Sequence, residues 1–265
     1  MDKARSIDFY KYEGTGNDFV ILHDPSGQWR PPPDRIRAWC DRRFGIGADG
    51  LIVIRPARDA DYRMDYYNAD GNIGSMCGNG ARCAFHLAQQ VGLSGATARF
   101  AAYDGLHTAH QLPDGRIRIS MQDVDRMTMS GDAFVLDTGS PHYVRFVDVI
   151  DNVDVLSEGR TIRHSPPFGK EGINVNFVQV DAEGLILRTY ERGVEDITLS
   201  CGTGATAAVL AFATLRELAR GPVAVHVLGG SLEVGFVRKA DGGYGEITLS
   251  GPARCVFTGS LLLTE

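Results

Sequence analysis

Lysine is scarce in this 265-residue chain, which has only Lys3, Lys11, Lys170 and Lys239. An enzyme that uses pyridoxal phosphate needs a lysine for its Schiff base, so few positions are available for that cofactor. No run of lysine or arginine occurs, and the net charge is −6. These features argue against nucleic acid as a partner.

Long apolar stretches are also missing. No stretch of about 18 or more apolar residues could cross a membrane, and residues 1–5 lack the apolar core of a signal peptide. We therefore expect a soluble, cytoplasmic protein with no membrane partner.

The five cysteines are an odd number at irregular positions and do not suggest a secreted disulfide framework. No Cys-x-x-Cys motif is present, so a thiol redox protein is a weaker alternative. The histidines show no metal-ligand spacing, which predicts no metal site. The glycine-rich loops match neither a dinucleotide fingerprint nor a phosphate-binding P-loop.

The length and an apolar content of 43% are sufficient for two domains with separate cores. Turn signals separate many short alternating segments, and each half carries one main helix. We expect an α+β fold of two pseudo-symmetric domains, each a curved, mostly antiparallel sheet wrapped around a central helix. The expected halves are residues 1–131 and 132–252, and the sequence leaves open which half the C-terminal strand at 253–265 packs on, the first half being one of the two options.

Cys77 follows a polar, glycine-rich segment and precedes an apolar pattern with helical spacing that ends at Gly92. The cysteine is thus expected at the first turn of a helix, where the dipole favours a thiolate over a thiol. Backbone N–H groups at such a helix start can also hold an anion.

The same arrangement occurs a second time. Cys201 begins a Cys-Gly-x-Gly-Ala sequence identical in pattern to that at Cys77, and it opens a helix expected from about Thr206 to Arg220. This second helix is apolar nearly all round, which indicates that a sheet encloses it. We therefore interpret the chain as two related halves that each present one thiol and one anion-binding helix end.

Two thiols at equivalent helix starts suit the removal of a proton from one face of a carbon and its return to the other. The carbon would be the α-carbon of an amino acid, and backbone N–H groups would stabilise the charge that develops on its carboxylate. No electron-sink cofactor is then required. Either cysteine alone is more simply a packing residue, but the matched pair favours function, and Cys40, Cys83 and Cys255 are expected to be structural.

The chain resembles the cofactor-independent diaminopimelate epimerases along most of its length. The matching segments, in the family's order, are Gly16 to Phe19, Arg43 to Gly50, Asn68 to Gly71, Met76 to Cys83, Gly139 to His142, Asn174 to Phe177, Tyr190 to Gly193 and Cys201 to Gly204. Each motif alone is weak, but their combined order is highly specific. The resemblance implies an isomerase of lysine and peptidoglycan precursor biosynthesis that interconverts L,L- and meso-diaminopimelate, and a homodimer.

The resemblance also assigns roles to residues, with Cys77 and Cys201 as the acid–base pair. The implied substrate-binding residues are Asn17, Asn68, Gly78, Asn79, Asn174, Glu191, Arg192, Gly202 and Thr203. Among these, Gly78, Asn79, Gly202 and Thr203 would donate backbone N–H groups to the reacting carboxylate, and Arg192 suits the distal carboxylate. His142 and Ser140 would support the site.

Two positions depart from the family pattern. Ser140 stands where an asparagine is expected, and Gly50 stands where some members carry glutamine. The alternatives are a proline racemase or hydroxyproline epimerase of the same fold, which would not need Arg192 or Asn68, and a non-catalytic amino-acid binding protein.

Overall fold

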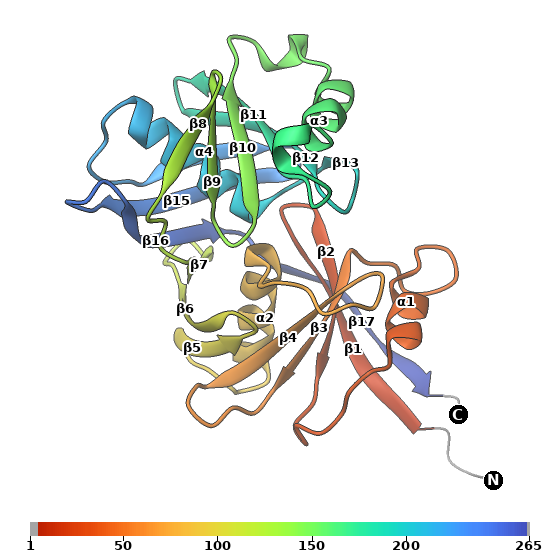
Figure 1. The fold of residues 1–265 in the computed structure, drawn as a ribbon. Coiled ribbons are helices and arrows are strands. Elements are labelled where there is room, and N and C mark those ends of the chain that lie inside the picture. The colour runs from red at the N-terminus through yellow and green to blue at the C-terminus, as the bar shows by residue number, and fades with distance from the viewer. Residues whose placement is uncertain (1–4, 264–265) are drawn as a thin grey trace. The chain divides into compact units, whose positions relative to one another are not determined.

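The structure is a computed structural model that describes residues 5–263, and Figure 1 shows its ribbon. The chain divides into two compact units, Met1–Ile119 with Pro252–Glu265 and Ser120–Gly251. Each unit consists mainly of strands and has one long helix, so the expected α+β fold with two sheet-rich halves is confirmed. Within residues 5–263, no helix combines the length and apolar character needed to cross a membrane.

The first unit has two helices. Its elements are β1 (Arg5–Gly14), β2 (Asn17–His23), α1 (Pro33–Cys40), β3 (Gly50–Arg55), β4 (Tyr62–Asn68), α2 (Gly78–Gln90), β5 (Thr97–Ala102), β6 (Gly105–Gln111), β7 (Ile117–Ser120) and β17 (Arg254–Leu263). The strands pair in the order β17-β1-β2-β3-β4-β5-β6-β7. The pairs β2–β3 and β4–β5 are parallel, and the others are antiparallel. Parallel neighbours need a crossover connection, and α1 and α2 lie in these two crossovers.

The second unit repeats this scheme. Its elements are β8 (Met127–Ser130), β9 (Ala133–Asp137), β10 (Pro141–Phe146), η1 (Ile150–Asn152), α3 (Val155–Arg163), η2 (Pro166–Phe168), β11 (Asn174–Asp181), β12 (Gly184–Glu191), β13 (Asp196–Thr198), α4 (Gly202–Leu215), β14 (Val223–Val227), β15 (Gly230–Arg238) and β16 (Tyr244–Gly251). The order β8-β9-β10-β11-β12-β14-β15-β16 has parallel pairs at β10–β11 and β12–β14. The sequence of parallel and antiparallel pairs is therefore the same in both units, with α3 and α4 in the crossovers.

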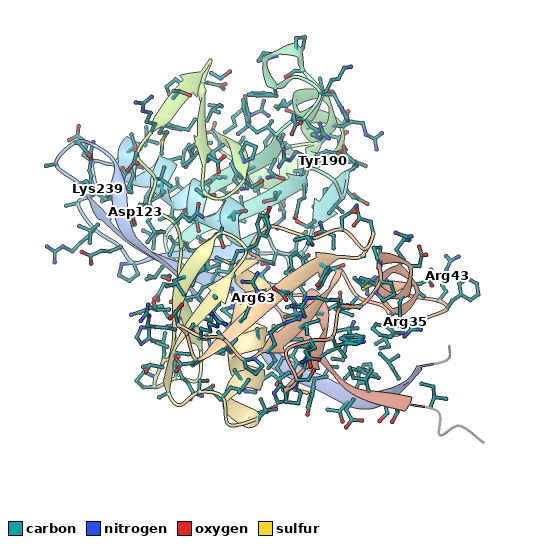
Figure 2. The ribbon with its side chains drawn as sticks, turned by 60° about the horizontal axis from the view of Figure 1, so that its bottom comes forward. Arg35, Arg43, Arg63, Asp123, Tyr190 and Lys239 are labelled. Atoms are coloured by element: carbon teal, nitrogen blue, oxygen red, sulfur yellow. The ribbon has the colours of Figure 1, made fainter. Side chains whose placement is uncertain are left out.

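The division between the units falls after Ile119, whereas the sequence pattern placed it after residue 131. Residues 120–131 belong to the second unit because they bond to its strands. Val124 exchanges backbone hydrogen bonds with Tyr244 at 2.9 and 2.7 Å, and the Asp123 carboxylate pairs with Lys239 at 2.9 Å. Both side chains of this ion pair are labelled in Figure 2. At the other end of the chain, β17 pairs antiparallel with β1 of the first unit.

The helix α4 is enclosed by its own unit, as its uniformly apolar sequence predicts. It packs against β9, β10, β11, β12, β14, β15 and β16, and Figure 1 shows it among these strands. Val209 and Leu210 are fully buried, and burying an aliphatic side chain of this size stabilises the fold by about 1.5–3 kcal/mol.

The two long helices end in the same type of cap. After α2, Gly92 has a φ of 76°, and the N–H of Leu93 donates to Ala88 O at 2.8 Å. After α4, Glu217 has a φ of 53°, and Leu218 N–H donates to Ala213 O at 2.9 Å. Both are Schellman motifs with a left-handed residue. The prediction of a helix from about Thr206 to Arg220 was wrong at both ends. The helix α4 begins earlier, at Gly202, directly after Cys201. It also ends earlier, at Leu215, because the left-handed backbone of Glu217 stops it.

Candidate active site

Cys77 is the N-cap residue of α2, with extended backbone angles of φ −103° and ψ 116°. The helix lies close to β3: a Cβ added to Gly80 would be 2.9 Å from Ile52 Cδ1. The N–H groups of a first helical turn lie outside the helix's own hydrogen-bond ladder and can bind an anion. Cys77, Gly78 and Asn79 are therefore placed as the sequence predicted, at the start of a buried helix.

Asn17, the first residue of β2, is the immediate neighbour of this helix start. Its Oδ1 lies 3.6 Å from Cys77 Sγ and accepts a hydrogen bond from Asn79 Nδ2 at 3.3 Å. On its other side, Asn17 Nδ2 donates to the Asp49 carboxylate at 2.7 Å. The structure thus brings together three predicted residues and adds Asp49, which the sequence analysis did not identify.

Asp49 belongs to a cluster of charged groups behind Asn17. Arg42 bonds to both Asp49 and Asp18 at 2.7 Å, and Lys11 bonds to Asp18 at 2.6 Å. Burial of Asp18 opposes its ionisation, but the hydrogen bonds from Arg42 and Lys11 outweigh burial and hold its pKa below the usual value. The Asp18 carboxylate is therefore charged at neutral pH and anchors the cluster.

Gly50 is one of the departures from the family pattern, and its neighbour Tyr66 explains why a side chain is absent. A Cβ at Gly50 would lie 2.5 Å from Tyr66 Cε2 and 2.6 Å from the Tyr67 carbonyl. The Tyr66 ring likewise lies 2.5 Å from a Cβ added to Gly74. Asn68, opposite Gly50 at the end of β4, is exposed, and its backbone N–H donates to Asn72 O at 2.9 Å.

Cys201 is the N-cap residue of α4 and has backbone angles close to those of Cys77, with φ −119° and ψ 109°. Its Sγ accepts the N–H of Gly204 at 3.4 Å and lies 3.5 Å from the Thr203 hydroxyl. Gly204 is required at this position, since an added Cβ would be 2.6 Å from Asn176 Oδ1. Gly202 and Thr203 lie in the first turn of α4, directly after Cys201, although the helix itself was expected to begin only at about Thr206.

A second polar group forms where β10, β11 and β12 meet. Asn174 Nδ2 donates to Ser140 Oγ at 2.9 Å, and Asn174 Oδ1 accepts the backbone N–H of Arg192 at 2.9 Å. The guanidinium of Arg192 also donates to Ser140 Oγ at 3.4 Å. Ser140, Asn174 and Arg192 are thus brought together, and Glu191 ends the adjoining strand β12.

Tyr190 fixes the end of β12 from the opposite side. This residue, labelled in Figure 2, is fully buried, and its hydroxyl donates to the Glu195 carboxylate at 3.2 Å. A Cβ on Gly159 of α3 would lie 2.5 Å from Tyr190 Cβ, so the helix packs tightly on the strand. This packing holds the backbone that presents Glu191 and Arg192.

His142 is fully buried behind this group. Burial and the positive charge of Arg192 lower the pKa of His142 to about 3, against a hydrogen bond from Asn176 that opposes the shift. Asn176 Nδ2 donates to His142 Nδ1 at 3.0 Å, while Asn176 Oδ1 accepts the Thr189 hydroxyl at 2.9 Å. His142 is therefore neutral at physiological pH and has a supporting position rather than an acid–base one.

Asp49 and Asn176 were not among the residues predicted for the site. Asp49 stands inside the glycine-rich loop before β3, where an acidic residue among glycines was the available signal. Asn176 is two residues beyond Asn174 in β11, and alternate residues of a strand share a face.

Of the remaining cysteines, Cys40 and Cys83 are buried, as expected of packing residues, whereas Cys255 is partly exposed. Burial raises the pKa of Cys40 to about 11 and raises that of Cys83 further. Burial also raises the pKa of Cys255. These three thiols are protonated at neutral pH.

Comparison with known proteins identifies the family. The family model described as diaminopimelate epimerase matches the chain twice, at residues 9–135 and 134–256. A diaminopimelate epimerase from Flavobacterium psychrophilum is 44% identical over 251 residues, which cover 94% of this chain and 97% of the relative. One from Chlorobaculum tepidum is 42% identical over 259 residues, with coverages of 94% and 99%.

Solved structures share the fold at low identity. A phenazine biosynthesis protein of the PhzF family from Bacillus anthracis has a TM-score of 0.80 at 12% identity and covers 98% of this chain and 100% of its own. A hydroxyproline epimerase from Agrobacterium vitis has a TM-score of 0.71 at 15% identity, with coverages of 100% and 95%. The resemblance inferred from the sequence motifs is confirmed: the chain belongs to the diaminopimelate epimerase family.

Proposed function

We propose that Cys77 and Cys201 are the acid and base of a diaminopimelate epimerase, an isomerase that interconverts the L,L and meso isomers in lysine and peptidoglycan precursor biosynthesis. One thiolate would take the α-proton from one face of the substrate carbon, and the other thiol would donate a proton to the opposite face. The observation that carries the proposal is the equivalence of the two cysteines. Each is the N-cap of the long helix in its unit, at the same place in the repeated strand order.

The helix starts supply the groups that such a reaction needs. The carbanion formed at the α-carbon places negative charge on the adjoining carboxylate, and preorganised N–H donors stabilise that charge most in the transition state. We assign this role to the backbone of Gly78, Asn79, Gly202 and Thr203. No electron-sink cofactor is required for this step.

The polar side chains would recognise the two ends of diaminopimelate. Arg192, with its planar guanidinium beside Ser140 and Asn174, suits the distal carboxylate. Asn17, Asn68 and Glu191 complete the substrate-binding set, and His142 supports Asn176 behind it. A substrate such as proline has one carboxylate and would leave Arg192 without its partner, which favours diaminopimelate over the racemase alternative.

The test is turnover of L,L-diaminopimelate to the meso isomer by purified, reduced protein without pyridoxal phosphate. We expect Cys77→Ala and Cys201→Ala each to lose about 10³-fold in turnover, the magnitude of an acid–base group, while calorimetry still detects substrate binding. Cys255→Ala is the matched control and should retain wild-type turnover. Turnover within tenfold of wild type in either active-site variant, or epimerisation of proline instead, would contradict the proposal.

The homodimer and the cytoplasmic location stay predictions of the family resemblance. Sedimentation of the purified protein tests the first of these.

A further inference from the structure

A four-residue turn, residues 192–195, joins β12 to β13 in the second unit. Glu191 and Asp196 are paired in the antiparallel register at its base, and the N–H of Glu195 donates to Glu191 O at 2.8 Å. The turn carries Arg192, the residue assigned to the distal carboxylate of the substrate. The conformation of the turn therefore determines where the Arg192 guanidinium lies.

Glu195 has a left-handed backbone, with a φ of 59°. This conformation is strained for a residue that has a Cβ, whereas glycine adopts it freely. A strained residue persists only where the surrounding contacts fix its conformation, and such residues are concentrated at functional sites. The contacts of the Glu195 side chain are therefore the first place to look for a function of the turn.

The Glu195 carboxylate joins the turn to the end of α3. Its Oε1 accepts the backbone N–H of Gly193 at 3.0 Å and Arg163 Nε at 2.9 Å. Its Oε2 accepts the Tyr190 hydroxyl at 3.2 Å and lies 3.3 Å from His164 Nε2. Burial opposes ionisation of this carboxylate, but the hydrogen bonds from Gly193, Arg163 and Tyr190 hold its pKa below the usual value. One charged group thus connects the turn, the strand and the helix end.

Arg192 is itself held by two side chains. Asn174 Oδ1 accepts the Arg192 backbone N–H at 2.9 Å, and the Arg192 guanidinium donates to Ser140 Oγ at 3.4 Å. The second contact is long for a hydrogen bond, so the guanidinium depends on the backbone that carries it. Glu195 bonds to both sequence neighbours of Arg192, to one through its backbone N–H and to the other through its carboxylate.

We propose that Glu195 is a positioning residue that acts through Arg192: its carboxylate holds the turn in the shape that directs the guanidinium to the distal carboxylate of the substrate. The proposal rests on the proposed function, in which Arg192 binds that carboxylate. The distal carboxylate is remote from the reacting carbon, so it is bound equally before and during proton transfer. Glu195 should therefore affect the KM of diaminopimelate and leave kcat nearly unchanged.

The test compares Glu195→Gly with the wild-type protein in steady-state turnover of L,L-diaminopimelate. Glycine removes the carboxylate and the backbone strain together, so a loss cannot be due to strain. We expect KM to rise about tenfold, the effect of one lost hydrogen bond, while kcat stays within about threefold. Glu217→Gly is the matched control and should keep the wild-type KM, because Glu217 is also left-handed but follows α4. A wild-type KM in Glu195→Gly would overturn the proposal.

Glu195→Gln separates hydrogen bonding from charge. Three N–H donors meet at Oε1, one from Gly193 and two from Arg163. The glutamine oxygen should occupy that position, and its NH₂ group should then face the Tyr190 hydroxyl, which can accept. We expect a KM within about threefold of wild type. A KM raised as far as in Glu195→Gly would show that charge, and not the fixing of the turn, determines KM, and would contradict the proposal.

The combination with Arg192→Ala shows whether Glu195 acts through Arg192. Arg192→Ala alone should raise KM by more than Glu195→Gly, since it removes the donor to the distal carboxylate. Adding Glu195→Gly to Arg192→Ala should raise KM no further, because the positioned group is absent. If the two single effects multiply in the double variant, Glu195 acts independently of Arg192 and the proposal is wrong.

Glu195→Asp guards against misfolding of Glu195→Gly, which leaves the 11% exposed Arg163 side chain without its carboxylate. Aspartate keeps the negative charge and tolerates the left-handed backbone, but its side chain is one methylene shorter. We expect KM to rise about threefold in this variant. A wild-type KM in Glu195→Asp would contradict the need for a glutamate at this position.

Hydrogen exchange measured without substrate separates this proposal from the proposed function. Exchange in peptides that cover residues 191–196 should accelerate about tenfold in Glu195→Gly, while peptides of α4 exchange as in the wild type. Unchanged exchange in the turn would overturn the positioning role whatever the chain acts on. A wild-type KM in Arg192→Ala, with faster exchange in Glu195→Gly, would instead contradict the assignment of Arg192 on which the proposal rests.

Discussion

The two units use one strand scheme and one helix start, yet they surround their cysteines differently. Cys77 lies beside the amide oxygen of Asn17, and the NH₂ group of Asn17 donates to Asp49, which belongs to a cluster of charged side chains. Cys201 faces a backbone N–H, and behind it lies the buried pair of His142 and Asn176. The two units therefore share the position of the cysteine at the helix start, while the side chains around the two sulfur atoms differ.

The same divergence is visible at equivalent register positions. The first residue of β3, Gly50, pairs with Phe19, and the first residue of β11, Asn174, pairs with His142. The first unit thus has an aromatic ring and a glycine where the second has a buried imidazole and an amide. At these register positions the second unit therefore has polar side chains where the first unit has a glycine and an apolar ring.

The largest expected difference between the two units is the loss of turnover caused by substituting the glycine three residues after each cysteine, Gly80 or Gly204. In Gly204→Ala, the new Cβ would be 2.6 Å from Asn176 Oδ1 and 3.2 Å from Cys201 Sγ. We expect turnover to fall about 100-fold as the helix start shifts. Gly80→Ala meets the end of the flexible Ile52 side chain at 2.9 Å and should lose less. Steady-state kinetics of both variants measure this, and an equal loss would contradict the distinction.

A smaller effect is expected at Gly50, where Tyr66 fills the space. Gly50→Ala should destabilise the protein by about 2 kcal/mol, because the Cβ overlaps the Tyr66 ring and the backbone of Tyr67. Urea unfolding measures the change. The double variant Gly50→Ala with Tyr66→Ala should recover part of the loss that is due to the ring. If the double variant recovers none of the lost stability, overlap with the Tyr66 ring is not the cause of the destabilisation by Gly50→Ala.

The buried His142 should make the free energy of unfolding depend on pH. His142 has a folded pKa of about 3 and a reference value of 6.5, so between these values the unfolded chain binds one proton more. Stability should therefore rise as the pH increases from 3 to 6.5, with a slope up to about 1.4 kcal/mol per pH unit from this group. Above pH 6.5 the contribution is constant.

His142→Asn retains an acceptor for Asn176 and removes the titration. Subtracting its unfolding free energy from that of the wild type, at pH 5 to 8, isolates the contribution of the histidine. Parallel curves for the two proteins over this range would show that the buried imidazole does not titrate as described.

The smallest expected effect is a change in stability from substitutions at the C-terminal caps of α2 and α4. Gly92 and Glu217 both have left-handed backbones after their helices, but only glycine adopts this conformation without a steric cost. Glu217→Gly should stabilise the protein by about 1 kcal/mol. Gly92→Ala should destabilise it by a similar amount, and thermal unfolding of both variants measures the pair. Destabilisation by Glu217→Gly would contradict the strain at this residue.

Local patterns in the sequence were sufficient to predict a cysteine at the start of each long helix and the burial of α4, although the first residue of α4 was expected at about Thr206 and not at Gly202. Each of these two cysteines, Cys77 and Cys201, is followed by a Gly-x-Gly sequence and then by an apolar helical segment, which is the pattern that indicated a helix start. The end of α4 was mispredicted, since no glycine marks the left-handed position that Glu217 occupies. A cap of that kind depends on tertiary packing rather than on residue preference.

Contacts between segments that are distant in the sequence could not be predicted from the sequence pattern. Asn17 meets Asp49 only because β2 and β3 pair in parallel with Phe19 opposite Gly50. The boundary after Ile119 likewise depends on hydrogen bonds from residues 121–124 to β16. Such register cannot be deduced from composition or local spacing, because it is fixed by the assembled sheet.

Deuterium labelling during the first turnovers tests the two-thiol mechanism. L,L-Diaminopimelate is incubated with the wild-type protein in D₂O, and the unreacted substrate and the meso product are analysed at low conversion. Two thiols predict product with one deuterium at the inverted carbon, while the remaining substrate stays almost unlabelled, because the donated proton comes from a thiol equilibrated with solvent. Product that keeps the original protium would mean that a single group moves the proton between faces, and the two-cysteine mechanism would be wrong.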